Sequence, residues 1–257
     1  QDWLIKLFTP LFSQDAPTET LLLHTLAAQN EFNVPHIRNQ GELEGWPYLV
    51  LSRLPGLPLD TLWHTLLPAE KEQVAASLGR LMAALHRTPT AGLEALQIDW
   101  AVFVSRQIAT CVERQRQAGA SQAWLDEIAA FLADLPPLYE PGFRPVLLNA
   151  DLNPAHLFCE RTPSGWQITG LIDFGDAMLG HPYYEFVAPG FITQRSPQLR
   201  RLMLQAYGFT PHALTPALSR CLLAYTLLHR FANLPDWLGL LGENPPANLV
   251  ELQVALW

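Results

Sequence analysis

The sequence has little of what marks secreted or membrane proteins. Only three cysteines occur in 257 residues, at Cys111, Cys159 and Cys221. An odd number of widely separated cysteines is not the pattern of a disulfide framework, so we expect reduced thiols and a cytoplasmic protein. No apolar run approaches the length of a bilayer, and no signal peptide is visible. We therefore expect no membrane partner.

Positive charge is also scarce. The chain has 16 Lys and Arg against 24 Asp and Glu, a net charge of −8 at pH 7. This balance disfavours nucleic acid as a partner and fits a cationic small molecule better. Low-complexity segments and repeats are absent, and the length suffices for one large domain or two lobes. The chain opens at Gln1 without Met and enters an apolar run at once, which we interpret as a chain that has lost its beginning.

The first fifty or so residues read as strands around one helix. Apolar and turn patterns predict a strand at Trp3–Phe8, a helix at Thr18–Ala28, and a hairpin formed by His36–Glu42 and Trp46–Leu51. A connector with proline and glycine follows. We place a boundary there, between a strand-rich part at residues 1–54 and the remainder at 55–257.

The remainder reads as mostly helical. Predicted helices cover Pro68–Arg87, Trp100–Arg116, Ser121–Leu135, Pro197–Tyr207 and Pro216–Asn233, and a strand-rich insert covers Val146–Ile172. A small strand-rich part followed by a larger helical part predicts a two-lobed α+β enzyme.

The insert carries two carboxylates at strand ends. Asp151 lies in a short loop within VLLNADLNPAHLF, and Asp173 follows the apolar run that ends at Ile172. A carboxylate in such a loop can accept the proton of a substrate hydroxyl, and a second one can hold a divalent metal. His156 can curl back to the same cavity. The alternative is that both acids are turn formers or helix caps.

Lys6 lies at the centre of the first predicted strand. A lysine in an apolar strand is costly to bury unless its ammonium finds an anion, such as a phosphate or a neighbouring carboxylate. Glu19, on the following helix, is a candidate partner. The alternative is a lysine at a strand edge that extends to solvent.

Other kinds of site fit parts of the pattern. Asp151, His156 and Asp173 could be the ligands of a metallohydrolase. Asp151, His156 and Cys159 could also bind a metal, but no second Cys and His pair has the spacing of a structural zinc site. The Gly-x-Ser-x-Gly motif of serine hydrolases is absent.

With these residues assembled, the chain resembles the aminoglycoside phosphotransferase superfamily over nearly its whole length. These are small-molecule kinases with a protein-kinase-like fold, related to choline, fructosamine and homoserine-type kinases. The resemblance implies that Lys6 contacts nucleotide phosphates with Glu19 as its partner, and that backbone groups of Ser52 and Leu54 hold adenine. It aligns Asn149 to His156 with the catalytic loop HxDxxxxN, and Ile172 to Ala177 with the segment of the metal-binding aspartate.

The resemblance therefore implies an ATP-dependent O-phosphotransferase acting on a small-molecule hydroxyl. Asp151 would accept the hydroxyl proton, and Asp173 with His156 would hold Mg²⁺. The acceptor would lie among the helices after Pro182, against Asp176 and Glu185 if it is cationic. Its identity is not encoded in any motif, and neither is the oligomeric state.

The chain also departs from the family pattern. Asn149 replaces a histidine, and His156 replaces a metal-binding asparagine; imidazole suits Mg²⁺ less well than a carbonyl oxygen and makes Mn²⁺ a second option. His181 and Glu185 each stand at a position where the family typically has aspartate. The strands and glycine-bearing loop that precede the lysine in the family are missing here. The substitution at His156 and the missing loop favour an alternative, a degenerate kinase-like module that binds a nucleotide or partner without transferring phosphate.

Overall fold

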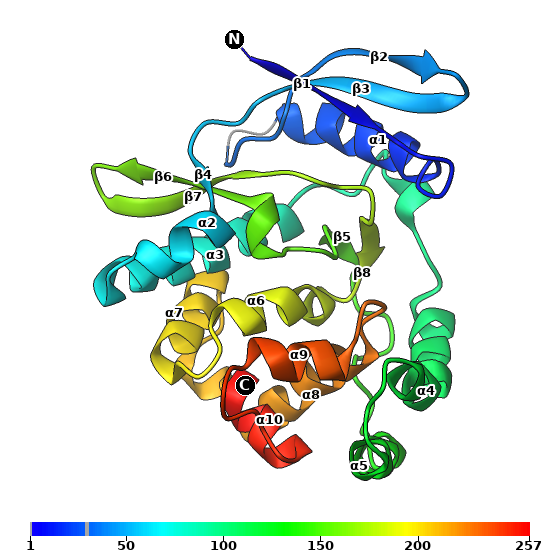
Figure 1. The fold of residues 1–257 in the computed structure, drawn as a ribbon, viewed down its shortest axis with the longest axis vertical. Coiled ribbons are helices and arrows are strands. Elements are labelled where there is room, and N and C mark those ends of the chain that lie inside the picture. The colour runs from blue at the N-terminus through cyan, green and yellow to red at the C-terminus, as the bar shows by residue number, and fades with distance from the viewer. Residues whose placement is uncertain (1, 29–30) are drawn as a thin grey trace.

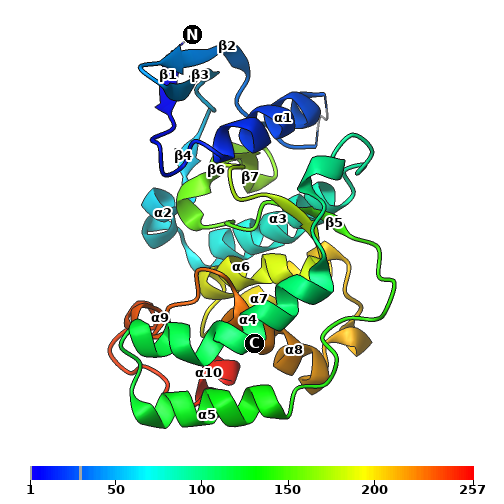
Figure 2. The ribbon, with the colours of Figure 1, turned by 90° about the vertical axis from the view of Figure 1, so that its right-hand side faces the viewer.

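The computed structural model describes residues 2–28 and 31–257 and has two lobes (Figures 1 and 2). A small N-terminal lobe places a sheet above one helix. A larger lobe below it is built mainly of helices and contains the remaining strands. The predicted division into a strand-rich and a helical part is confirmed.

The small lobe is an antiparallel sheet of three strands packed on α1. It consists of β1 (Trp3–Leu7), α1 (Asp15–Ala27), β2 (Ile37–Leu43) and β3 (Trp46–Ser52), with strand order β1-β3-β2. The predicted hairpin forms because Glu44 and Gly45 both take positive φ, as the tight turn between twisted strands requires. Helix α1 buries Leu22, Leu23 and Leu26 against the sheet.

The larger lobe contains helices and two small sheets. Its helices are α2 (Leu59–Leu62), α3 (Pro68–His86), α4 (Trp100–Gln117), α5 (Gln122–Ala133), α6 (Val187–Ile192), α7 (Pro197–Tyr207), α8 (Pro216–Leu228), α9 (Leu234–Leu240) and α10 (Leu249–Leu256). Its strands are β4 (Leu57–Pro58), β5 (Val146–Leu148), β6 (Leu157–Thr162), β7 (Gly165–Leu171) and β8 (Met178–Gly180). They pair in the orders β4-β6-β7 and β5-β8.

One predicted helix is too long. The pattern extends it to Asn233, but α8 ends at Leu228 because His229 turns into extended backbone (φ −56°, ψ 139°). The N–H of Phe231 then donates to Nδ1 of His229 and closes the turn. Thr215 caps the start of α8 as predicted, accepting from the N–H of Leu218 at 3.2 Å.

Within the described residues, the backbone joins the two lobes at two places. The chain crosses from β3 to β4 through residues 53–56. The segment before β2 is also hydrogen-bonded to β7: the N–H of Asn33 donates to Thr169 O (2.7 Å), and the N–H of Leu171 donates to Asn33 O (2.9 Å). This second connection fixes the small lobe directly beside the strand that leads to Asp173.

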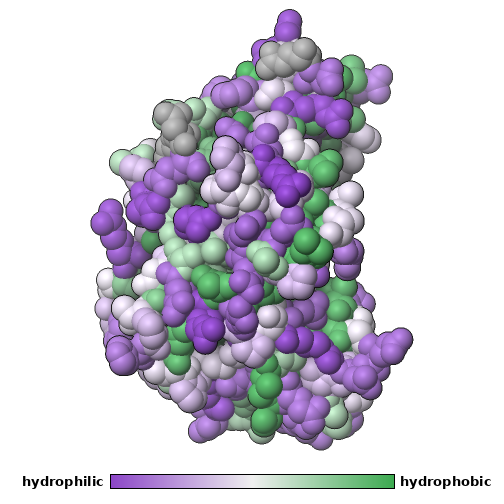
Figure 3. Space-filling view, turned by 90° about the vertical axis from the view of Figure 1, so that its left-hand side faces the viewer, coloured by the Kyte–Doolittle hydropathy of each residue, from purple (hydrophilic) through white to green (hydrophobic). Residues whose placement is uncertain are grey.

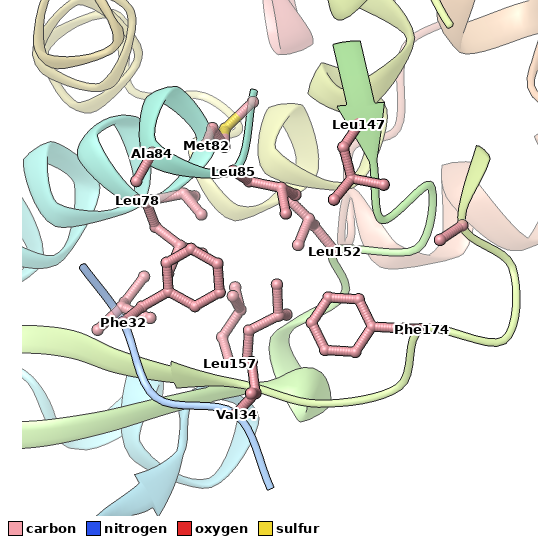
Figure 4. Close-up of a cluster of buried hydrophobic side chains, with 14 of the residues drawn as sticks. Phe32, Val34, Leu78, Met82, Ala84, Leu85, Leu147, Leu152, Leu157 and Phe174 are labelled. Atoms are coloured by element: carbon pink, nitrogen blue, oxygen red, sulfur yellow. The ribbon is translucent and has the colours of Figure 1, made fainter. Parts of the chain in front are cut away.

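The core passes beneath the two acid-bearing loops. In Figure 4 the side chains of Leu152 and Phe174, each next to one of the acids, point toward residues of α3 such as Leu85. Both are essentially buried. Burying such side chains stabilises the fold by about 1.5–3 kcal/mol each, so each loop is attached to the core by one buried side chain.

Helix α3 also packs closely on α7. A Cβ added at Gly79 would lie 2.1 Å from the carbonyl oxygen of Met203, so this helical glycine lets the two backbones approach. On the face shown in Figure 3, hydrophobic residues are dispersed among hydrophilic ones. Among the residues that the structure describes, no helix is both long and apolar enough to cross a membrane.

Candidate active site

Lys6 joins the two lobes through carboxylates. Its Nζ lies 2.5 Å from Oε2 of Glu19 and 3.0 Å from Oδ1 of Asp173. Glu19 projects from α1 and is 2% exposed, whereas Asp173 follows β7 in the larger lobe. The partner expected for Lys6 from the sequence is therefore at ion-pair distance.

Charge keeps this cluster ionised. Burial lowers the pKa of Lys6, but the carboxylates of Glu19 and Asp173 outweigh it, and the net pKa is raised. Burial likewise raises the pKa of Asp173, but the ammonium of Lys6 outweighs that effect and holds the pKa below its usual value. Burial raises the pKa of Glu19, and the ammonium of Lys6 offsets only part of that rise. The charged forms of Lys6 and Asp173 are therefore the ones that the cluster favours.

Asp151 is held in a short loop between β5 and a 3-10 helix at Pro154–His156. The preceding Ala150 takes φ +63°, a left-handed conformation that turns the loop sharply. The side-chain amide of Asn153 donates to Oδ2 of Asp151 at 3.1 Å. Asn153 is not among the residues predicted for the site, although an Asn before Pro is a typical helix cap, and its side chain does cap the 3-10 helix.

His156 lies between the two acids. Its Nδ1 is 3.6 Å from Oδ2 of Asp151, and its Nε2 is 3.8 Å from Oδ2 of Asp173. Nδ1 is also 2.9 Å from the backbone oxygen of Asp151, which can only accept, and 3.1 Å from the amide nitrogen of Asn153, which can only donate. The tautomer with the proton on Nδ1 makes the shorter of these two contacts. In the neutral ring the lone pair of Nε2 is then on the side of Asp173.

Glu185 supports the loop from below. It is 2% exposed, and its two oxygens accept the backbone N–H groups of Asn149 (2.7 Å) and Ala150 (3.0 Å). Nε2 of His86 lies 3.6 Å from the same carboxylate. The side-chain amide of Asn149 in turn donates to the backbone oxygen of Asp173 at 2.6 Å, which ties the two acid-bearing loops together.

The two acids expected to face a cationic acceptor are already engaged. Glu185 is bonded to the catalytic loop, as described, and Asp176 accepts an ion pair from Nη2 of Arg230 at 3.1 Å. Arg230 also donates to the backbone oxygen of Asp176. Glu185 also lines a cavity beside Asp151, so its place near the acceptor, expected from the sequence, stays a prediction.

Ser52 and Leu54, at the connection between the lobes, differ in how their backbone donors are used. The N–H of Ser52 donates to His36 O (3.0 Å), and its hydroxyl accepts from the N–H of His36 (2.9 Å). By contrast, the N–H of Leu54 donates to no atom of the described residues. A ligand could therefore bind that N–H without disrupting the fold.

The acids offer a limited set of metal ligands. Within residues 2–28 and 31–257, no group of three or more His, Cys, Asp or Glu side chains converges in metal-binding geometry. Asp173 supplies the carboxylate oxygen that Mg²⁺ prefers, and the Nε2 lone pair of His156 suits Mn²⁺ better. These two residues fit a divalent metal held jointly with a phosphate ligand, whereas a metallohydrolase would need a third protein ligand.

Comparison with known proteins identifies the family. Residues 1–217 match the sequence model of the phosphotransferase enzyme family. The chain belongs to this family. The acid-bearing loops, Lys6 and the connection between the lobes all lie inside the matched region.

Solved phosphotransferases share the fold. The GDP complex of wild-type aminoglycoside 2'-phosphotransferase-IIIa aligns with a TM-score of 0.73 at 20% identity, covering 88% of this chain and 76% of that one. Macrolide 2'-phosphotransferase MphH from Brachybacterium faecium aligns at 0.64 and 24% identity, covering 87% and 74%. Aminoglycoside-3'-phosphotransferase of type VIII aligns at 0.60 and 20% identity, covering 88% and 83%. The predicted protein-kinase-like, two-lobed α+β phosphotransferase fold is confirmed.

Proposed function

We propose that the protein is a kinase that transfers the γ-phosphoryl group of ATP to a hydroxyl of a small molecule. The observation that carries the proposal is the ion pairing of Lys6 with both Glu19 and Asp173. The ring of His156 lies between this cluster and Asp151. Phosphoryl transfer depends mainly on positioning and charge neutralisation, and in kinases the lysine–glutamate pair and the metal-binding aspartate must both be in place.

In this proposal Asp151 accepts the proton of the acceptor hydroxyl. Its Oδ2 is held by Asn153, and no described residue bonds its Oδ1, which is left for the substrate. The acceptor oxygen forms a bond to the γ-phosphorus while the bond to the ADP oxygen breaks. The hydroxyl proton passes to Asp151, and ADP leaves with the negative charge that develops on its β-phosphate.

The nucleotide would lie between the lobes. The ammonium of Lys6 would contact its phosphates, and backbone groups of Ser52 and Leu54 would hold the adenine, the free N–H of Leu54 acting as donor. Asp173 and His156 would hold Mg²⁺ or Mn²⁺, which when bound neutralises charge on the transferred group. We place the reaction in the cytoplasm, where ATP and both metals are available.

Release of ADP from ATP, or of GDP from GTP, by the full chain tests this proposal. Turnover is measured with ATP and with GTP, each with Mg²⁺ and with Mn²⁺, across a panel of small-molecule alcohols. Asp151→Asn should lower turnover by about 10²–10⁴-fold, because it removes the proton acceptor at nearly constant shape. Asp126→Asn, at an exposed site on α5, is the matched control and should change nothing. Equal rates for Asp151→Asn and the unaltered protein would contradict the proposal.

A second candidate is a kinase-like module that binds nucleotide without transferring phosphate. One feature favours it: His156, whose imidazole suits Mg²⁺ less well than an oxygen ligand, stands where the family has asparagine. Titration calorimetry with ATP and each metal separates the candidates. Binding without ADP formation under any metal or acceptor would favour the module.

A further inference from the structure

A cavity of about 200 Å³ opens beside Asp151 in the larger lobe. The catalytic loop, residues 150–154, forms one wall. The other walls come from α6, α9 and the turn after α8, and most of their lining side chains are apolar: Val187, Ala188, Phe191, Phe231, Trp237 and Leu240. Because ligand pockets usually measure about 300–1,000 Å³, this cavity admits one part of a larger molecule or the whole of a small one.

The charges around the cavity leave little for a polycation. Among the described lining residues, only Asp151 and Glu185 carry a carboxylate. Glu185 is buried, and both its oxygens accept backbone N–H groups. The nearby Asp176 is neutralised by Arg230. Asp151 is the lining acid whose Oδ1 accepts from no described residue, and the proposed reaction needs that carboxylate for the hydroxyl proton.

The remaining polar wall is uncharged. His229 lines the cavity and accepts the N–H of Phe231 through Nδ1, and its ring stacks on Tyr184 with centroids 4.6 Å apart. Burial lowers the pKa of His229 to about 3, so the ring is neutral at physiological pH. Two other polar side chains line the cavity: Asn153 is engaged with Asp151, and the hydroxyl of Tyr184 accepts the N–H of Arg230.

The aromatic side chains do not form an open cage for a quaternary ammonium either. The guanidinium carbon of Arg230 lies 5.0 Å from the ring centroid of Phe231. That ring face is therefore already occupied by a guanidinium, whose charge is paired with Asp176. A second cation would find no free aromatic face there.

We propose that this cavity binds the phosphate acceptor, and that the part of the acceptor inside it is uncharged and apolar, an alicyclic or aromatic group that carries the reacting hydroxyl. The assignment rests on the kinase function proposed above. Phe191 and Trp237 pack against the apolar group while the hydroxyl faces Asp151. The product is the phosphate monoester of this alcohol together with ADP.

The test compares three acceptor classes on the full chain with ATP and Mn²⁺ or Mg²⁺. The neutral alcohols are 2-phenylethanol and 4-phenylcyclohexanol, the polycation is kanamycin, and the quaternary ammonium alcohol is choline. We expect the neutral alcohols to give the highest kcat/KM. Trp237→Ala and the rim variant Phe231→Ala should raise KM for 2-phenylethanol about tenfold, the effect of losing part of an apolar contact. Trp46→Ala, on the distant β3, should leave it unchanged.

A binding measurement keeps this result separate from the kinase proposal. Titration of 2-phenylethanol against the tryptophan fluorescence of the protein needs no turnover. Binding that Phe231→Ala and Trp237→Ala weaken, without ADP formation from any acceptor, would support the cavity assignment and refute the kinase. Preferred turnover of kanamycin or choline would overturn the assignment while the kinase stands. Neutral alcohols that neither bind nor react would overturn it as well.

Discussion

The Nζ atom of Lys6 lies 3.0 Å from Oδ1 of Asp173, so the first strand of the small lobe is in direct ionic contact with the loop after β7 of the larger lobe. The same ammonium is paired with Glu19. The ammonium is thus shared between two carboxylates, and we expect that nucleotide phosphates require a metal to be accommodated beside Asp173.

Lys6 is expected to dominate phosphate binding, and the chain offers a natural control. Its only other lysine is Lys71, whose Nζ lies 5.1 Å from the ring centroid of Trp63, away from the acids. Lys6→Ala should weaken ATP binding about tenfold to a hundredfold, because a hydrogen bond to a charged group contributes about 1.5–3 kcal/mol. Lys71→Ala should leave the Kd unchanged. Calorimetry measures both, and equal weakening by the two variants would remove Lys6 from the nucleotide site.

The metal preference should depend on His156. Replacing its imidazole by the amide of His156→Asn supplies an oxygen ligand, so activity with Mg²⁺ should rise relative to activity with Mn²⁺ by about tenfold. The ratio of kcat/KM with the two metals measures the change. His24→Asn, at an exposed site on α1, is the matched control. An unchanged ratio would show that His156 does not contact the metal.

Glu185 should matter for stability as well as for activity. In Glu185→Gln one of the two backbone N–H groups, from Asn149 or Ala150, loses its acceptor inside the protein. Leaving a buried donor unsatisfied costs about 1–3 kcal/mol, so the free energy of unfolding should fall by that amount. Urea denaturation measures it, with the exposed Glu42→Gln as control. A loss below that of the control would mean that the loop does not depend on this carboxylate.

Acid should destabilise the protein through two buried histidines. Burial lowers the pKa of His229 to about 3 and of His181 to about 4, against about 6.5 in the unfolded chain. Below pH 6.5 the unfolded state therefore binds protons that the native state does not, and stability falls as the pH drops from 6.5 towards 4. Each histidine contributes at most about 1.4 kcal/mol per pH unit within that window.

The measurement is the free energy of unfolding against pH. His229→Gln should make the slope between pH 6.5 and 4 shallower, whereas substitution of the exposed His24 should not. An unchanged slope in His229→Gln would show that this ring is not held neutral.

Alanine substitutions at two helical glycines should distinguish a packing effect from a helix-propensity effect. Gly79→Ala should destabilise the fold by about 1–3 kcal/mol, because its Cβ would lie 2.1 Å from the backbone oxygen of Met203 and force α3 from α7. Gly239→Ala in α9, where a Cβ would meet nothing within 4 Å, should stabilise it by about 0.5–1 kcal/mol. Thermal unfolding of the two variants measures both signs, and the same sign for both would contradict the close packing.

The sequence predicted most of the longer elements and the residues at the boundary between the lobes. Periodicity and turn chemistry located the hairpin and α7, and the family resemblance brought Lys6, Glu19 and Asp173 together. The assigned roles of Asp151, His156, Ser52 and Leu54 stay predictions, as does the domain boundary at residue 54.

What the sequence did not predict depends on tertiary contacts. The helices α6, α9 and α10 are short and adjoin prolines, so no periodic pattern of sufficient length marks them. The end of α8 is set by His229, whose ring is packed on Tyr184 from a distant segment. The pairing of Arg230 with Asp176 and the apolar cavity likewise join segments whose spacing carries no signal.

The hydrogen bonds of Asn33 to β7 have a mechanical consequence. Together with the crossing at residues 53–56 they fasten one side of the small lobe to the larger one, so we expect relative movement of the lobes to pivot near these segments. Lys6 lies on β1, outside these segments, so such a movement would break its ion pair with Asp173. In the proposed function, the lysine that contacts the phosphates would then move further than the backbone at Leu54 that holds the base.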